Sequence, residues 1–392
     1  MCSMKKTFDE VVLFARTGLN PRQNFKLGQG NNAYITIKNI KNNSLIVDEN
    51  TDVVDDEAIK LIHKRSQIKK GDILFASIGI MGDMYIIEEE PTDWDINESV
   101  FAFTLDTSIV RQKYFYYIFR VKSTMDYLAS NSSGSTFKSI KMNQLKKMVF
   151  DIPSLEEQDQ IIKLLDKVCN VIEMRKQELS ALDNLIKARF VEMFGDAREN
   201  PNGYTTVPFI DIIEYMGDIG SNGANKVVVD HLHMKDEEDY AMMVRFTNFT
   251  KNDFIDDVKY VSKEAYDFFK KSQIFGGELI ICKIGSAGQN YVMPYLNRPV
   301  SLGLNQIMVR INENILMPYL YQYLHTDYGE FLISGCINGA VTKTITKTEL
   351  KKIPVMLPPM ELQNEFAEFI KQVDKSKVVF YIHKNNCKEE AQ

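Results

Sequence analysis

A short polar loop rich in hydroxyl and ammonium side chains occurs twice in the chain. The first copy is Gly134-Ser135-Thr136-Phe137-Lys138, and the second is Gly339-Ala340-Val341-Thr342-Lys343, followed by Thr344. Serine, threonine and lysine side chains suit the phosphate oxygens of nucleic acid. We therefore predict nucleic-acid contacts at these polar positions: Ser135, Thr136, Lys138, Thr342, Lys343 and Thr344. The alternative is a solvated loop that caps a helix.

A second group of polar residues follows the first strands of each half. Asparagine and arginine suit base edges in the major groove, and lysine and threonine add phosphate contacts. Ser77 and Lys283 stand at matched positions further along and join these candidates. The full second group is Lys38, Asn39, Ser77, Arg245, Thr247, Asn248 and Lys283. The competing interpretation is that they are residues that keep a strand edge soluble.

Catalytic motifs do not emerge from the sequence. It has no Walker-type phosphate loop, no H-E-x-x-H zinc motif, no G-x-S-x-G nucleophile turn and no methyltransferase signature. His231 and His233, beside Asp230 and Asp236, resemble a metal site, but a solvated loop is the preferred interpretation. We therefore predict no catalytic residue, no metal and no cofactor in this chain.

Bulk composition limits the class of protein. The formal net charge is −6 and 44% of the residues are hydrophobic, which suits a globular protein but not one that coats nucleic acid. Five dispersed cysteines fit free thiols in a reducing compartment. No stretch resembles a signal peptide or a membrane span, so we expect a cytoplasmic protein.

The chain contains a long internal repeat. Gly71-Asp72-Ile73-Leu74 matches Gly277-Glu278-Leu279-Ile280, a displacement of 206 residues (277 − 71). The polar loops repeat at a displacement of 205 (343 − 138), and so do the Ile-Pro and Leu-Pro blocks at 152–158 and 357–363. This period is far longer than the 20–50 residues of a solenoid unit, so it indicates a duplicated domain.

A helical pattern follows each proline block. From Ile161 to Met193, apolar residues and two arginines recur at alternating steps of four and three, which predicts a long helix ending near Phe194. Gly195 suits the position just after its end. The second copy repeats the seam at Phe366, Ile370 and Val373, but the apolar rhythm fails after Phe380, so this helix is expected to be shorter or frayed.

The order of these features resembles the specificity subunit of type I restriction-modification systems. The resemblance rests on the glycine-acid blocks before Ser77-Ile78-Gly79 and Lys283-Ile284-Gly285, the polar loops, the proline blocks and the central segment 185–196, and it covers nearly the whole chain. It implies an α+β fold in which two duplicated β-rich target-recognition domains are separated by long antiparallel coiled-coil helices. The implied domains are 1–153 and 196–358, with a central spacer helix at 154–195 and a C-terminal one at 359–392.

The resemblance also implies a function and partners. Each domain would read one half of a split site in double-stranded DNA. The helices would dock methyltransferase subunits that use S-adenosylmethionine, and a motor-nuclease subunit would join them. In an antiparallel pair, a short second helix leaves part of the first uncovered, so we predict that a methyltransferase subunit or a second copy of the chain covers this apolar stripe. The stripe comprises Ile161, Leu165, Val168 and Ile172.

Two other classes of protein remain as alternatives. An orphan specificity-like scaffold without its own DNA target would fit the acidic charge and the short last helix. A nuclease or methyltransferase acting alone would need a metal or cofactor site that the sequence does not contain.

Overall fold

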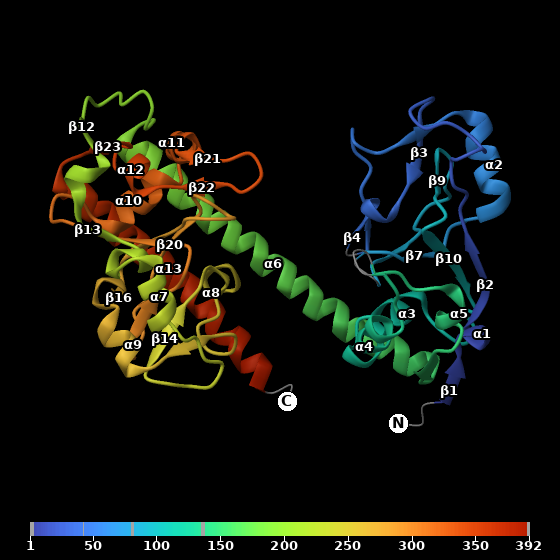
Figure 1. Cartoon of the computed structure of the whole chain (residues 1–392). Coiled ribbons are helices and arrows are strands. Elements are labelled where there is room, and N and C mark those ends of the chain that lie inside the picture. The colour runs from blue at the N-terminus through green and yellow to red at the C-terminus, as the bar shows by residue number, and fades with distance from the viewer. Residues whose placement is uncertain (1–3, 42, 80–81, 135–137, 390–392) are drawn as a thin grey trace. The chain divides into compact units, whose positions relative to one another are not determined.

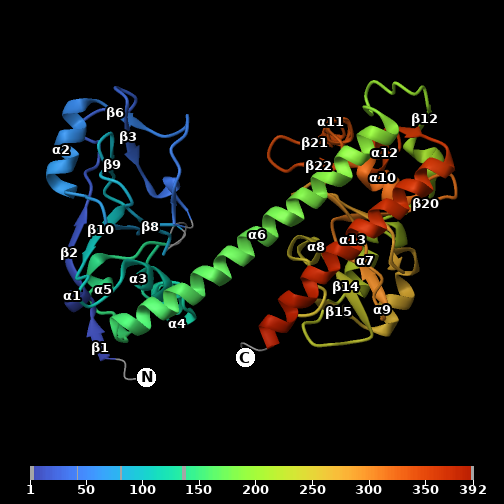
Figure 2. The same cartoon turned by 180° about the vertical axis from the view of Figure 1, so that it is seen from behind.

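The computed structural model describes residues 4–41, 43–79, 82–134 and 138–389. The chain divides into two compact units, Met1–Glu173 and Met174–Gln392, and each is described by itself. Figures 1 and 2 label their helices and strands from two sides. The mixture of helices and sheets confirms the predicted α+β class.

The first unit contains a four-stranded sheet in the order β2-β10-β7-β8, a three-stranded sheet β6-β3-β9 and the pairs β1-β11 and β4-β5. Its strands are β1 (Met4–Thr7), β2 (Val12–Thr17), β3 (Asn32–Ile35), β4 (Ile40–Lys41), β5 (Ser44–Leu45), β6 (Val53–Val54), β7 (Ile73–Ala76), β8 (Met84–Ile86), β9 (Trp94–Ile96), β10 (Val100–Leu105) and β11 (Val149–Ile152). Its helices before the spacer are α1 (Phe8–Val11), η1 (Ile37–Asn39), α2 (Asp56–Ser66), α3 (Gln112–Ile118), α4 (Lys122–Ser130) and α5 (Met142–Leu145).

The second unit contains two four-stranded sheets, β13-β20-β17-β18 and β15-β14-β19-β16, and the pairs β12-β23 and β21-β22. Its strands are β12 (Thr205–Pro208), β13 (Ile213–Gly217), β14 (Ala241–Val244), β15 (Lys259–Val261), β16 (Gln273–Ile274), β17 (Leu279–Cys282), β18 (Asn290–Val292), β19 (Val300–Leu302), β20 (Gln306–Ile311), β21 (Ile337–Asn338), β22 (Thr344–Ile345) and β23 (Pro354–Leu357). Its shorter helices are η2 (Phe209–Ile212), η3 (Ile219–Asn222), α7 (Asn225–His231), α8 (Phe246–Lys251), α9 (Lys263–Phe268), η4 (Lys270–Ser272), α10 (Met317–Leu324), α11 (Asp327–Gly335) and α12 (Lys347–Leu350).

The duplication predicted from the sequence is confirmed by the strand order and the register. The sheets β2-β10-β7-β8 and β13-β20-β17-β18 have the same order. Both first strands carry a bulge at the same place: Leu13 is the extra residue opposite β10, and Glu214 is the extra residue opposite β20. A matching bulge is a strong sign of common architecture because it changes which side chains face which side of a sheet.

Two long helices complete the chain. Helix α6 (Leu155–Phe194) has 40 residues, and it ends where the sequence predicted, immediately before Gly195. Gly195 has a φ of +78°, a left-handed conformation that favours glycine. Helix α13 (Met360–Glu389) is shorter, with 30 residues, although it continues beyond the point where the apolar seam fades.

The C-terminal half of α6 packs antiparallel to α13 within the second unit (Figure 2). The ion pairs run in opposite chain directions: Arg189 bonds Glu365 at 2.8 Å, and Asp183 bonds Lys377 at 2.7 Å. Between the helices, Phe190 and Phe366 are fully buried, with ring centroids 5.5 Å apart. The antiparallel helix pair predicted from the family resemblance is therefore present.

Each proline block ends in a buried glutamine whose hydrogen bonds give the block a structural role. Gln158 is completely buried, and its amide nitrogen donates to the carbonyl oxygens of Ile109 and Pro153, each at 2.9 Å. Its amide oxygen accepts a hydrogen bond from the Arg111 backbone nitrogen at 2.8 Å. Gln363 is also fully buried and accepts from the Leu316 backbone nitrogen at 2.9 Å. Each glutamine fastens the start of its long helix to the turn before α3 or α10.

Replacing Gln158 by alanine is expected to lower the free energy of unfolding of the first unit by about 1–3 kcal/mol, because it leaves buried backbone groups without a hydrogen-bond partner. The fluorescence of Trp94, the single tryptophan, reports on this unit alone during denaturation. Gln160→Ala, at an exposed position two residues along the same helix, is the control and should have little effect. Equal midpoints for the two variants would contradict the role assigned to Gln158.

Candidate nucleic-acid interface

The polar loop of the first unit is bonded to the turn that follows β7. The Gly79 backbone nitrogen donates to the Lys138 carbonyl oxygen at 3.0 Å, and the Ile140 nitrogen donates to the Ser77 carbonyl oxygen at 2.9 Å. These bonds place Lys138, whose side chain is exposed, next to the Ser77 turn. The predicted contacts Ser135 and Thr136 lie outside the described residues.

The second unit repeats this arrangement, again with a lysine in the loop but with Lys283 in place of Ser77 in the turn. The Gly285 nitrogen donates to the Lys343 carbonyl oxygen at 3.2 Å, and the Ile345 nitrogen donates to the Lys283 carbonyl oxygen at 3.0 Å. Thr342 and Lys343 are exposed, while Thr344 is half-buried. Sequence positions about 60 residues apart are thus brought together in the same way in both halves.

Three candidates from the sequence have their polar groups bonded inside the protein. The Asn39 side chain accepts from the Thr36 nitrogen at 2.9 Å and donates to the Ile46 oxygen at 2.9 Å. Asn248, only 1% exposed, closes the turn before α8 by accepting from the Arg245 nitrogen at 2.8 Å. The buried Ser77 hydroxyl donates to the Ser99 carbonyl oxygen at 2.7 Å.

These bonds give Asn39, Asn248 and Ser77 a structural role, because buried polar groups must find partners within the fold. Arg245 is likewise bonded to Asp257 at 2.7 Å. Lys38 and Thr247 from the same two turns are exposed. The candidates free to meet a ligand are therefore fewer than the sequence suggested.

A charged cluster beside the second polar loop was not found from the sequence. The Lys283 and Lys347 ammonium groups each lie 2.9 Å from a different oxygen of the Asp218 carboxylate. Lys347 also donates to the Ser221 hydroxyl oxygen at 3.0 Å. Burial alone would raise the pKa of Asp218, but the hydrogen bonds from Lys283, Lys347 and Ser221 outweigh it and lower the pKa to about 2. The carboxylate is therefore charged throughout the neutral range.

A guanidinium group is held against a buried acid at matched places in both units. Arg16 on β2 bonds Asp72 at 2.8 Å and the Gln67 carbonyl oxygen at 2.7 Å. In the second unit, Arg310 on β20 bonds Glu278 at 3.3 Å and the Gln273 carbonyl oxygen at 2.6 Å. The same contact is thus made from different strands.

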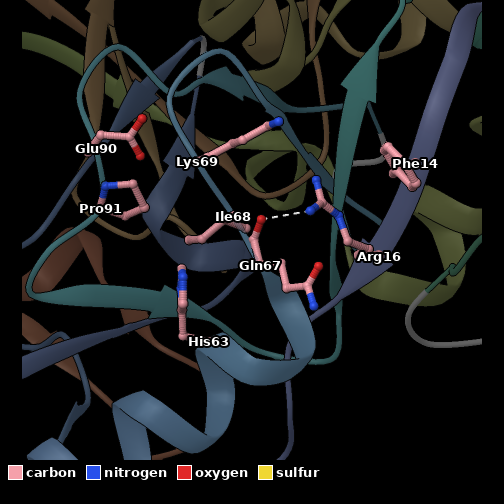
Figure 3. A pocket seen from close by; sticks show the side chains of 8 residues that line it. All are labelled: Phe14, Arg16, His63, Gln67, Ile68, Lys69, Glu90 and Pro91. Atoms are coloured by element: carbon pink, nitrogen blue, oxygen red, sulfur yellow. Dashed lines mark hydrogen bonds between the residues drawn. The ribbon is translucent and has the colours of Figure 1, made fainter.

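An open pocket of about 460 Å³ adjoins Arg16 (Figure 3). Figure 3 shows Arg16 turned toward the main chain at Gln67, with His63 on the opposite wall. His63 contacts the buried Asp95 carboxylate at 3.2 Å, and the Ser66 hydroxyl bonds this same carboxylate at 2.9 Å. Because the serine bonds the acid and not the imidazole, these residues are not arranged as a nucleophile and its base.

Within the part of the chain that the structure describes, no three histidine, cysteine, aspartate or glutamate side chains gather as a metal site. At His231, for which the sequence favoured a solvated loop over a metal site, the imidazole stands at the end of α7 and stacks on Phe268, with ring centroids 4.0 Å apart. Among the same residues, none of the helices combines the length and apolar character needed to cross a bilayer.

The apolar stripe predicted on α6 is partly exposed. Ile161 and Leu165 are half-buried, whereas Val168 is 47% exposed and Ile172 is 50% exposed. Leu164 and Val171, which the seam pattern did not include, are also exposed. Helix α3 lies along this part of α6, because Lys113 bonds Asp166 at 2.7 Å and Tyr117 bonds the same carboxylate.

Comparison with known proteins is consistent with this architecture. A family described as "Type I restriction modification DNA specificity domain" matches residues 3–184 and 217–386. A putative type I restriction enzyme specificity subunit of Methanocaldococcus jannaschii is 23% identical over 318 residues, 78% of this chain and 72% of the relative. A second specificity subunit of that organism is 31% identical over 127 residues, 32% of this chain and 28% of the relative.

A solved structure has the same fold. The crystal structure of the S subunit of a type I restriction-modification system from M. genitalium superposes with a TM-score of 0.51 at 16% identity, covering 98% of this chain and 92% of that one. The two family matches together span most of the sequence and coincide with the two halves of the repeat. The chain therefore belongs to the type I restriction-modification DNA specificity family, whose members supply DNA sequence specificity and not catalysis.

Proposed function

We propose that the chain recognises a split DNA site, one half through residues 1–153 and the other through residues 196–358. Residues 154–195 and 359–392 would form the helical spacer that sets the distance between the two halves. The observation that carries this proposal is the matched loop arrangement: equivalent backbone hydrogen bonds hold the loop lysines, Lys138 and Lys343, beside turns that differ in carrying Ser77 in one unit and Lys283 in the other. Equivalent frames with different side chains suit two different base sequences.

The proposed DNA contacts are the exposed candidates around these loops. Lysines at 138 and 343 would bind phosphate or base edges, and Thr342 would support the second loop. Lys38 and Thr247 are proposed as neighbouring contacts because both project from turns that Asn39 and Asn248 hold in place. Ser135, Thr136 and Thr344 stay in the proposed set on the grounds of their residue types.

We propose methyltransferase subunits as the partners that cover the α6 stripe, and a motor-nuclease subunit as a further member of the complex. Self-association through the helices is the competing outcome. The exposed valines and isoleucine on α6 favour a protein partner, because large apolar side chains gathered on one helix are seldom left in water. A cytoplasmic location follows from this role and remains a prediction.

The acidic net charge is compatible with DNA binding because several carboxylates are paired with basic side chains and therefore add little local negative charge. In the acidic run before β14, Asp236 bonds Lys259, Asp239 bonds Lys235, and Glu238 bonds Arg298 at 3.1 Å. Local charge at the interface, more than the total, determines phosphate affinity.

The test is methylome sequencing of a host that expresses this chain together with its neighbouring methyltransferase. We expect methylation at a split sequence with a fixed unread gap. The purified chain alone should neither methylate nor cleave DNA, because the methyl donor site belongs to the partner. Turnover by the chain alone, or a continuous recognition sequence, would contradict the proposal.

Lys138→Met is expected to weaken or relax recognition of one half-site only, and Lys343→Met the other half-site only. A lost base contact costs about 1–3 kcal/mol, whereas a lost phosphate contact lowers the salt slope of binding by about one. Methylome sequencing identifies the affected half, and binding at several salt concentrations separates the two kinds of contact. Each variant is the control for the other, and an equal effect of either one on both halves would exclude modular recognition.

A further inference from the structure

The Lys283–Asp218–Lys347 cluster has no counterpart at the three equivalent positions of the first unit, all of which the structure describes, although the surrounding backbone is matched. Asp218 follows Gly217, which lies opposite Met308, just as Thr17 follows Arg16, which lies opposite the equivalent Ala102. Lys283 corresponds to Ser77, because the carbonyl oxygen of each accepts the matched hydrogen bond from an isoleucine nitrogen, Ile345 or Ile140. Lys347 corresponds to Met142, because each lies two residues after that isoleucine. The three residues that form the cluster in the second unit are charged, whereas the residues at the equivalent positions of the first unit are neutral.

The fold does not require these charges. The first unit makes the same two loop-to-turn hydrogen bonds with Thr17, Ser77 and Met142 at the three positions. Two cations and one anion leave the second unit with one more positive charge at this place than the first. A structural ion pair would be complete with a single lysine, so the second lysine calls for another explanation.

The geometry leaves donors available for a ligand. An ammonium group has three N–H donors. Lys283 uses one on Asp218, and Lys347 uses one on Asp218 and one on Ser221. Their side chains are 37% and 33% exposed, so the remaining donors are accessible to an anion.

Asp218 also keeps the two ammonium groups in place. Its side chain is only 9% exposed and is fixed by the Ser221 hydroxyl, which donates to the carboxylate at 3.0 Å. Long lysine side chains normally lose considerable rotamer entropy on binding, and prior fixation reduces that cost. The bridging carboxylate therefore holds the two ammonium groups side by side, because its negative charge offsets the repulsion between them.

We propose that Lys283 and Lys347, positioned by Asp218, bind the phosphate backbone of the DNA at the half-site read by the second domain. The proposal rests on the proposed function, and it predicts an asymmetry: the second half-site is held by an additional backbone contact that the first lacks. Phosphate is favoured over base edges because lysine binds phosphate as a point charge, and two adjacent ammonium groups match the charge of a nucleic-acid backbone.

The test replaces the three residues with those of the first copy. The triple variant Asp218→Thr, Lys283→Ser, Lys347→Met should fold, because the first unit folds with these residues. The full chain is assembled with its methyltransferase subunit, and binding to a duplex that carries the methylome-defined site is measured from 50 to 200 mM salt. Each lost phosphate contact lowers the slope of log K against log salt by about 0.9, so the expected decrease is about 1.8.

Two further variants complete the design. Lys263→Met, in the same domain, changes the net charge by the same −1 and removes an exposed lysine that is paired with Asp267, so its slope should stay at the wild-type value. If the triple variant does not fold, Lys347→Met alone keeps the Lys283–Asp218 pair, and its slope should fall by about 0.9.

The outcomes separate the inference from the proposed function. An unchanged slope in the triple variant would show that the cluster is only structural, and a changed methylation sequence would show that it reads bases; either result overturns the phosphate assignment. If the wild-type complex itself failed to bind a split site, the proposed function would fail first.

Discussion

Replacing Leu165 and Val168 together by aspartate is expected to abolish assembly of the chain with its methyltransferase subunit while both domains stay folded. The two positions lie on the apolar stripe of α6, where Val168 is 47% exposed. A carboxylate placed in an apolar interface without a partner costs several kcal/mol, on the order of 3–5 for a buried unpaired charge. Two such charges should eliminate a typical subunit interface, as measured by co-purification and size-exclusion chromatography.

The control adds the same charge to the other side of the helix. Asn170→Asp with Gln177→Asp introduces two carboxylates at exposed positions that helical geometry turns away from Val168. This variant should assemble normally, and Trp94 fluorescence should report a folded first unit in both cases. If the Leu165 and Val168 variant assembled as well as the control, the stripe would not be the docking surface.

The architecture was predictable because it depends on sequence patterns that both halves of the duplicated chain retain. The repeat, the end of the first helix before Gly195 and the antiparallel seam at Phe366 all rest on apolar spacing, on glycine conformation or on a family resemblance. Burial enforces such spacing along every helix and strand. The order of motifs around the helix was enough to indicate the family.

The site was only partly predictable because residue type does not reveal where a polar group finds its partner. Asn39 and Asn248 occur in equivalent turns and looked like base-reading amides, yet both close those turns with internal hydrogen bonds. Asparagine is as suitable for capping a turn as for reading adenine. The Asp218 cluster joins residues 65 and 64 positions apart in the chain, so no local pattern could reveal it.

The duplicated fold also offers an internal comparison for the guanidinium contact. Asp72 and Glu278 are equivalent, at a displacement of 206 (278 − 72), and so are Thr104 and Arg310 (310 − 104). The first unit supplies its guanidinium from Arg16 on β2, opposite Ala102. The second unit has Gly217 at that position, opposite Met308, and supplies the guanidinium from Arg310. The arginine has moved to the neighbouring strand while its acid and carbonyl partners have stayed.

Arg16→Gly is therefore expected to destabilise the first unit by about 3–5 kcal/mol, since it leaves the Asp72 carboxylate, 1% exposed, without its cation. Adding Thr104→Arg to this variant recreates the arrangement of the second unit and should restore most of the loss. In the wild-type background the same Thr104→Arg change should destabilise, because two guanidinium groups would compete for one carboxylate. Urea denaturation followed by Trp94 fluorescence measures all three variants. If positions 16 and 104 share the Asp72 carboxylate, Thr104→Arg stabilises the Arg16→Gly variant and destabilises the wild-type protein. An equal effect of Thr104→Arg in both backgrounds would mean that the two positions do not share the carboxylate.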